Sequence, residues 1–212
     1  MNFTEDQPEV VVVRTGSANI ASVAAALTRL GTVPHVTEDP KVVLAAPVVV
    51  LPGVGAFGAA VTHLRNRGLD EVIRERVRCD RPLLAICLGM QLLCESSEEH
   101  PGVAGLGIVP AHVGRFGRDQ RVPQMGWNRS LPAATCVLLR PDWMYFAHSF
   151  RIETIKGEWN VATTEYGGTF VSAFERGALL ACQFHPELSG SGGLALIGRW
   201  LSLAIGRKVV PC

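Results

Sequence analysis

An apolar segment that ends in a cysteine constrains the fold of this chain more than any other feature. Leu83–Ile86 has the composition of a buried strand, Cys87 follows it directly, and Gly89 opens a helix-forming segment. The cysteine is therefore predicted to lie on a tight turn between a strand and a helix, the arrangement of a nucleophile elbow. Such a turn exposes the thiol near the positive end of the helix dipole, and it directs the backbone N–H of Leu88 towards a developing oxyanion.

A second motif, Cys182–Glu187, contains the partners that a nucleophilic cysteine needs. His185 and Glu187 are two positions apart in it, so at an extended strand end both side chains point the same way. The carboxylate can then orient the imidazole towards Cys87. A lone cysteine at a strand end is more often a small buried hydrophobic residue, and a lone His-Pro-Glu is more often a turn. Their occurrence together, in this order and with apolar flanks, favours a Cys-His-Glu triad.

The first half of the chain alternates short apolar runs with helical segments. Strands are predicted at residues 10–13, 33–37, 48–51 and 83–86, and helices at residues 20–30, 61–67 and 70–78. This order predicts an α/β fold with an open, doubly wound, mostly parallel sheet that has helices on both faces. Ligands of such sheets bind beyond the carboxyl ends of the strands, where Val54 and Cys87 both fall.

The second half differs in character. Between Gly105 and Glu187 the apolar runs are short and rich in aromatic residues, which predicts a smaller antiparallel section, and a closing helix is expected at Leu194–Ile205. No repeat or linker divides the 212 residues, so we expect one domain over residues 10–206. Residues 1–9 are polar and acidic, unlike a secretory signal, and we expect them to form a disordered extension.

Charge and cysteine spacing exclude several function classes. The net charge is +1 and basic residues are not clustered with aromatic ones, which disfavours nucleic acid and anionic membranes as partners. Residues 42–61 carry no charge, but Pro47, Pro52 and Gly55 argue against a membrane span. The six cysteines show neither zinc-ligand spacing nor a disulfide framework. We therefore expect a cytoplasmic protein without a metal or cofactor.

A glycine-flanked segment, Gly53-Val54-Gly55, follows the third predicted strand. Glycine tolerates unusual backbone angles and a close approach to a ligand, so the main chain of Val54 and Gly55 is a candidate second oxyanion donor beside Cys87. An ordinary loop is an equally good interpretation of these residues alone. The segment lacks the pattern of a phosphate-binding loop, which disfavours a nucleotide site.

Several motifs together resemble known enzymes. The Cys-Leu-Gly-Met-Gln elbow and the His-Pro-Glu motif resemble the class I (triad) glutamine amidotransferases. With Pro52–Phe57, Pro123–Asn128 and Tyr145–Phe150, the chain resembles the glutaminase subunits of imidazole glycerol phosphate synthase, from about Val10 to Leu203. Met90 supports this branch, because anthranilate synthase components usually carry His there. Two residues depart from the family pattern: Ala85, where many members carry Gly, and Leu188, where many carry Lys.

The resemblance implies a reaction and its residues. Cys87 attacks the side-chain amide of glutamine, His185 protonates the leaving ammonia, and Glu187 orients His185, while water hydrolyses the resulting thioester. A His between Ala and Ser in an aromatic strand is more often a core residue, so His148 is the least secure member of the substrate set. The implied substrate-binding residues are Gly53, Gln91, Glu99, His148, Ser149 and Phe150.

The resemblance also implies a partner. In this family the ammonia passes to a (β/α)8-barrel cyclase subunit of a heterodimer, which makes imidazole glycerol phosphate and an aminoimidazole carboxamide ribotide in histidine biosynthesis. The matching partner-facing positions are Asn19, Gln124, Met125, Trp127 and Tyr145. Leu188 removes a charged contact that relatives with Lys make with the partner.

Two alternatives remain open from the sequence. In the first alternative, the chain is the glutaminase subunit of another class I amidotransferase, such as anthranilate synthase. In the second, it is a non-catalytic protein of the same fold in which Cys87 senses oxidants. The presence of both His185 and Glu187 disfavours the second alternative, since an inert triad would usually have lost one of them.

Overall fold

The structure, a computed structural model, describes residues 7–16 and 19–206, so residues 1–6 of the expected extension lie outside it. Its strands are β1 (Glu9–Val13), β2 (Val33–Thr37), β3 (Val49–Gly53), β4 (Leu83–Cys87), β5 (Cys94–Ser97), β6 (Val109–Arg115), β7 (Gln124–Pro132), β8 (Asp142–His148), β9 (Phe150–Ile152), β10 (Asn160–Glu165), β11 (Thr169–Arg176) and β12 (Leu179–Cys182). Its helices are α1 (Ile20–Arg29), α2 (Pro40–Ala45), α3 (Phe57–Asn66), α4 (Leu69–Arg78), α5 (Leu88–Leu92) and α6 (Gly190–Ile205), with a 3₁₀ turn, η1, at Pro186–Leu188.

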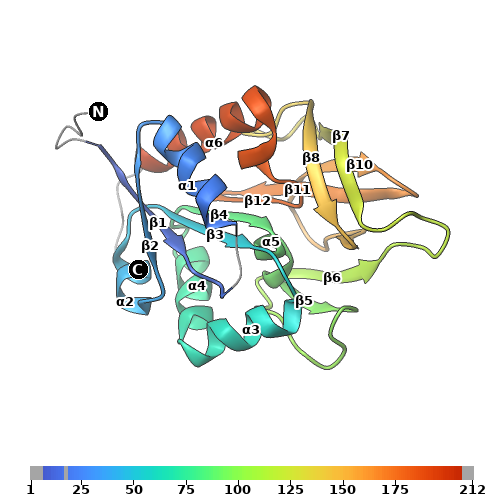
Figure 1. Cartoon of the computed structure of the whole chain (residues 1–212), viewed down its shortest axis with the longest axis horizontal. Helices are drawn as coiled ribbons and strands as arrows, with labels where there is room; N and C mark the ends of the chain where they lie inside the picture. Colours follow the sequence, from blue (N-terminus) through green and yellow to red (C-terminus); the bar gives the residue numbers. More distant parts are fainter. Residues whose placement is uncertain (1–6, 17–18, 207–212) are drawn as a thin grey trace.

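The strands of the described residues form one sheet of 12 strands with a parallel and an antiparallel part (Figure 1). Strands β2, β1, β3, β4 and β12 are neighbours in that order, and each adjacent pair is parallel. Beyond β12 the sheet continues through β11, β10, β7 and β8 in antiparallel pairs. The predicted α/β fold, with a parallel sheet and an antiparallel section in the second half, is confirmed.

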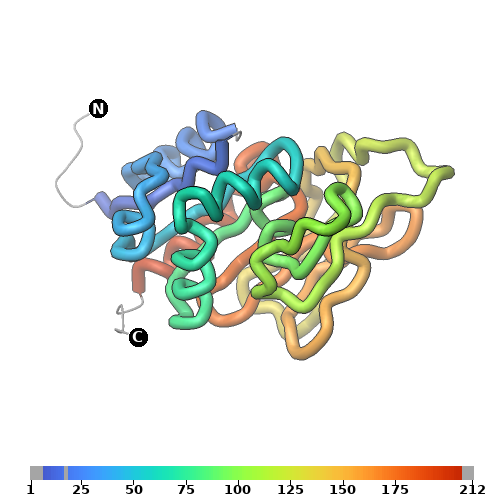
Figure 2. Tube along the Cα trace, turned by 90° about the horizontal axis from the view of Figure 1, so that it is seen from below, coloured from blue at the N-terminus to red at the C-terminus, as the bar shows by residue number. Residues whose placement is uncertain are grey.

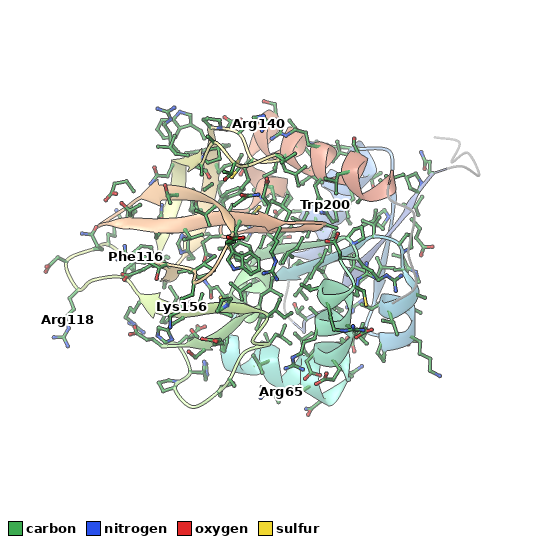
Figure 3. The ribbon with its side chains drawn as sticks, turned by 180° about the vertical axis from the view of Figure 1, so that it is seen from behind. Arg65, Phe116, Arg118, Arg140, Lys156 and Trp200 are labelled. Atoms are coloured by element: carbon green, nitrogen blue, oxygen red, sulfur yellow. The ribbon has the colours of Figure 1, made fainter. Side chains whose placement is uncertain are left out.

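Helices cover both faces of the parallel strands because the side chains of these strands alternate between two core layers. In β1, Val11 and Val13 pack with α2, α3 and α4, whereas Val10 and Val12 pack with α1 and α6. Figure 1 shows α1 and α6 on one side of the strands, and Figure 2 shows the opposite side, which α2, α3 and α4 cover. Trp200 of α6, labelled in Figure 3, is fully buried and donates its indole N–H to a carbonyl between β11 and β12.

Some predicted element bounds differ from those of the structure. Helix α2 was not predicted, although Asp39 caps it by accepting the N–H of Lys41 and Pro40 begins it; both are standard helix-start signals. The uncharged run that follows obscured them. Helices α3 and α6 each begin four residues earlier than predicted, at Phe57 and at Gly190. No helix in the described parts of the chain is both long and apolar enough to cross a membrane.

Candidate active site

Cys87 lies on a strained turn at the carboxyl end of β4, as the sequence predicts. Its backbone φ is 54° and its ψ is −111°, a region that residues with side chains rarely adopt. Helix α5 begins at the next residue, Leu88. Backbone strain of this kind persists only where the surrounding structure enforces it, and it is concentrated at functional sites. The turn therefore has the geometry of a nucleophile elbow.

Glycines hold the elbow tightly against strand β3. A Cβ on Gly89 would lie 2.1 Å from the carbonyl oxygen of Leu51, and a Cβ on Gly53 would lie 2.7 Å from the backbone nitrogen of Gly89. Gly53 is also the register partner of Cys87 across the β3–β4 pair. The segment that follows Gly53, including Gly55 with φ 98°, is consequently held next to the thiol.

The remaining members of the triad arrive from the other side of β4. Strand β12 is parallel to β4, with Cys182 opposite Ile86, so the chain beyond β12 emerges at the same sheet edge as Cys87. There the Nδ1 atom of His185 lies 2.9 Å from the Oε1 atom of Glu187. Both side chains are almost completely buried. The structure thus brings together the three residues that the sequence predicts as a triad.

The electrostatic surroundings favour the charged form of His185. Burial alone would lower the pKa of His185, but hydrogen bonds with the side chains of Cys87 and Glu187 outweigh it and raise this pKa from 6.5 to about 10. An imidazolium beside a thiol stabilises the thiolate, the nucleophilic form of cysteine. It also holds a proton that it can transfer to a leaving group.

A cavity of about 220 Å³ opens beside Cys87. Such a volume is below the ~300–1,000 Å³ of pockets for drug-sized ligands and suits a small polar molecule. Most of the predicted site residues lie on its wall, where Pro123 and Ala147 join them, whereas Gly53, His185 and Glu187 do not line it. The predicted residues that line it are Val54, Gly55, Cys87, Leu88, Gln91, Glu99, His148, Ser149 and Phe150.

The carboxylate of Glu99 is held in place at the cavity wall by a hydrogen bond. Its Oε2 atom accepts the backbone N–H of Phe57, the first residue of α3, at 2.9 Å. Phe57 is two residues beyond Gly55, with Ala56 between them. Glu99 therefore joins the cavity wall to the start of α3, in addition to offering a negative charge to a ligand.

His148 has electrostatic surroundings opposite to those of His185. Burial is the main cause that lowers the pKa of His148 to about 4, so its imidazole is neutral near pH 7. The Nδ1 atom donates to the carbonyl of Phe150 at 2.8 Å, and the buried Nε2 atom has no hydrogen-bond partner. The ring packs in contact with Phe116, Phe146 and Phe170.

The sequence prediction missed Gln183, a fully buried residue that contacts the nucleophile. Its Nε2 atom lies 3.7 Å from the sulfur of Cys87, and its Oε1 atom accepts from Gln91 at 2.9 Å. Gln91 donates in addition to the carbonyl of Phe150 at 3.1 Å. A polar residue within the apolar run that ends at His185 was the available signal. The two glutamines connect the elbow helix to the strand that carries the base.

The predicted partner-facing residues lie in different surroundings. Met125 and Trp127 lie two positions apart, on the same face of β7, and are 67% and 54% exposed. Tyr145, the register partner of Trp127, is half-buried and its ring is 6.1 Å from that of Trp127. Asn19 is exposed, whereas Gln124 is buried at the start of β7. An exposed Met and Trp side by side are typical of protein interfaces.

Comparisons with known proteins give a consistent result. The model of the family described as Glutamine amidotransferase class-I matches residues 11–197. The Imidazole glycerol phosphate synthase subunit HisH of Carboxydothermus hydrogenoformans is 43% identical over 191 residues, covering 88% of this chain and 96% of that protein. The HisH subunit of Dehalococcoides mccartyi is also 43% identical, over 94% of this chain and 99% of that protein.

Solved structures share the fold at lower sequence identity. A crystal structure of a glutamine amidotransferase superposes with a TM-score of 0.75 at 22% identity, covering 92% of this chain and 98% of that one. The structure of PurLQS from Thermotoga maritima gives a TM-score of 0.71 at 16% identity, covering 92% of this chain and 98% of that one. These similarities extend over nearly the whole chain and concern its architecture.

Proposed function

Because this chain belongs to the class I glutamine amidotransferases and, within them, to the HisH subunits of imidazole glycerol phosphate synthase, we propose that Cys87, His185 and Glu187 are its catalytic triad. It is an enzyme, the glutaminase subunit that acts in histidine biosynthesis. The observation that carries the triad assignment is the strained turn at Cys87, next to an imidazole that is itself hydrogen-bonded to a buried carboxylate.

The geometry supports a two-step reaction. The Cys87 thiolate adds to the side-chain carbonyl carbon of glutamine, and the backbone N–H groups of Leu88 and of the Val54–Gly55 segment stabilise the negative charge on the oxygen. His185 gives its proton to the amide nitrogen, the C–N bond breaks, and ammonia leaves. His185 then takes a proton from water, whose oxygen attacks the thioester and releases glutamate and the thiolate. Glu187 keeps the imidazole oriented in both steps.

The rest of the cavity supports binding of an amino acid. We assign the α-ammonium of glutamine to the carboxylate of Glu99, since charge-assisted hydrogen bonds of this kind are about twice as strong as neutral ones. The side chain of Gln91 and the main chain of Gly53, Ser149 and Phe150 complete the proposed substrate set. A neutral His148 adds a polar edge without a competing positive charge.

The proposal includes the partner and the extent of the domain. The HisH relatives are subunits of imidazole glycerol phosphate synthase, and we propose a (β/α)8-barrel cyclase as the other subunit, which receives the ammonia. We assign Asn19, Gln124, Met125, Trp127 and Tyr145 to the interface with it, and residues 10–206 to a single domain. A cytoplasmic location remains part of the same proposal.

Selective labelling tests the nucleophile. A glutamine-mimicking diazoketone is expected to modify Cys87 and to spare the other five cysteines, as read by peptide mass spectrometry. Cys87→Ala is expected to abolish glutamine-dependent synthesis by the complex while the reaction with added ammonia continues. Cys94, which is also buried and forms no disulfide, supplies the control variant Cys94→Ala. Labelling of Cys94 or Cys182 in place of Cys87 would refute the assignment.

A further inference from the structure

Ser189 is a buried polar residue that the reaction scheme does not use. It follows η1, two residues after Glu187, and its exposure is 2%. The hydroxyl donates to the carbonyl of His185 at 2.6 Å and accepts the backbone N–H of Tyr145 at 2.9 Å. Its single proton and one lone pair are therefore both engaged, which fixes the orientation of the hydroxyl.

A third hydrogen bond closes a ring between the same residues. The backbone N–H of His185 donates to the carbonyl of Tyr145 at 2.9 Å. The backbone N–H and C=O groups of His185 and of Tyr145 thus belong to one hydrogen-bonded set, in which the hydroxyl of Ser189 bridges the C=O of His185 and the N–H of Tyr145. Since the main chain of His185 is held to β8 in this way, a displacement of β8 moves the imidazole as well.

The set reaches the protein surface through two contacts. The ring of Tyr145 packs edge-on against Trp127, which is 54% exposed. Next to Ser189, Gly190 has φ 58°, and a Cβ there would lie 3.9 Å from the tip of the Trp127 ring. The exposed indole therefore lies beside the serine turn, about one methyl group away from Gly190, and it packs against Tyr145.

The opposite side of the serine turn is closely packed. A Cβ on Gly193 would lie 2.0 Å from the carbonyl oxygen of Pro186 and 2.7 Å from the Cβ of Ser189, so the first turn of α6 packs directly on the segment after His185. The N–H of Gly193 also donates to the carbonyl of Ser189 at 3.1 Å. The first turn of α6 therefore leaves the serine turn no free space on the side away from Trp127.

We propose that Ser189 is a positioning residue that ties the orientation of His185 to strand β8, so that docking of the cyclase on Met125 and Trp127 is transmitted to the triad. This inference rests on the proposed function and adds a route for its regulation. Without the hydroxyl, the N–H of Tyr145 loses its partner. Of the three hydrogen bonds in the set, only the one from the N–H of His185 to the carbonyl of Tyr145 then remains.

Steady-state glutamine hydrolysis by Ser189→Ala tests the inference. Rates are measured for the chain alone, with the cyclase, and with the cyclase and its phosphoribulosyl acceptor. If docking orders the triad in this way, the cyclase and its acceptor should raise the kcat of the wild type. We expect this stimulation to fall roughly tenfold or more in Ser189→Ala, because small misplacements of a catalytic group are that costly. The KM for glutamine and the affinity for the cyclase are expected to stay unchanged. Ser189→Thr, which retains the hydroxyl, should restore much of the stimulation.

Ser130→Ala is the matched control. Ser130 lies on β7, is also 2% exposed, and its hydroxyl pairs with that of Ser172 at 3.0 Å and not with the main chain of His185 or Tyr145. This variant should keep the stimulation of the wild type. Equal stimulation in Ser189→Ala and Ser130→Ala would overturn the inference, as would a loss confined to cyclase affinity. If Ser189→Ala does not fold, Ser189→Cys, which keeps the volume but weakens both hydrogen bonds, is subject to the same criteria.

A failure of the proposed function has a different signature. In that case the wild type itself would hydrolyse glutamine at the same rate with and without the cyclase, or not at all. Failure of the inference alone leaves the wild type strongly stimulated and Ser189→Ala equally so.

Discussion

The two buried histidines near Cys87 show how surroundings assign different roles to one residue type. His185 has a carboxylate and a thiol as partners and retains its proton, whereas His148 is enclosed by aromatic rings and loses it. Burial lowers the pKa of both imidazoles, and for His185 the hydrogen bonds and charge interactions with Cys87 and Glu187 reverse this effect. The charged histidine can donate a proton as an acid, whereas the neutral one lines the cavity as a hydrogen-bonding group without charge.

The raised pKa of His185 predicts a pH-dependent contribution to stability. A pKa of about 10 in the folded state, above the ordinary 6.5, contributes stability that is fully present below about pH 6.5 and is lost as the pH rises to about 10. Glu187→Gln removes one cause of this rise. Denaturant unfolding between pH 6 and 10 should therefore show a shallower decline for Glu187→Gln than for the wild type. Parallel curves for the two proteins would contradict this prediction.

The same two residues should differ in catalytic importance. His185→Ala removes the group that transfers the proton and is expected to abolish nearly all turnover. Glu187→Gln retains the shape of the orienting side chain and should leave a larger residual rate, measured as kcat with the cyclase present. Equal residual rates in the two variants would show that Glu187 does more than orient the imidazole.

Glu99 is predicted to have two separable roles. Glu99→Gln keeps an acceptor for the N–H of Phe57 but loses the charge for the substrate ammonium, and Glu99→Ala loses both. With glutamine, both variants should show a KM that is higher by about tenfold or more. With glutaramate, which lacks the α-ammonium, Glu99→Gln should match the wild type and Glu99→Ala should be slower. The exposed neighbour Glu95 provides the control variant Glu95→Gln, which should change neither rate.

At the scale of elements, the close packing of α5 against β3 requires that Gly53 and Gly89 have no side chain. Gly89→Ala places a methyl group 2.1 Å from a backbone oxygen of β3, which cannot move aside as a flexible side chain could. We expect Gly89→Ala to lower the free energy of unfolding by about 2 kcal/mol or more and to reduce turnover. Gly117→Ala, at an exposed position with open space around it, should stay within about 0.5 kcal/mol of the wild type. Chemical denaturation of both variants measures the difference.

The elements also show how far the sequence could be interpreted. The strand before Cys87 and the His-Pro-Glu segment were predictable because apolar runs and turn residues are local signals. Gln183 and Ser189 were not predicted, since their roles come from contacts with residues about 90 and 44 positions away, namely Gln91 and Tyr145. The burial of Gln124 was equally hidden, because it depends on the pairing of β7 with β8, in which Gln124 lies opposite the buried His148.

At the scale of the whole molecule, the exposed aromatic residues of β7 and β8 predict the position of the partner. Trp127→Ala is expected to weaken binding of the cyclase by about 2 kcal/mol, the size of an interface hot spot. Trp143 is equally exposed at 54% on the adjacent strand but lies outside the predicted set, so Trp143→Ala should have a smaller effect. Calorimetric titration of each variant with the cyclase compares them. A larger loss for Trp143→Ala would move the docking surface along the β7–β8 pair.

The central position of β12 has a consequence for the order of synthesis. This strand belongs to the last part of the chain, yet it pairs with β4 on one side and β11 on the other. A nascent polypeptide thus presents Cys87 long before His185 has left the ribosome, with one edge of β4 still unpaired. The reactive pair is completed by the final strand to enter the sheet, so a prematurely terminated product holds the thiol without its base and has no means of consuming glutamine.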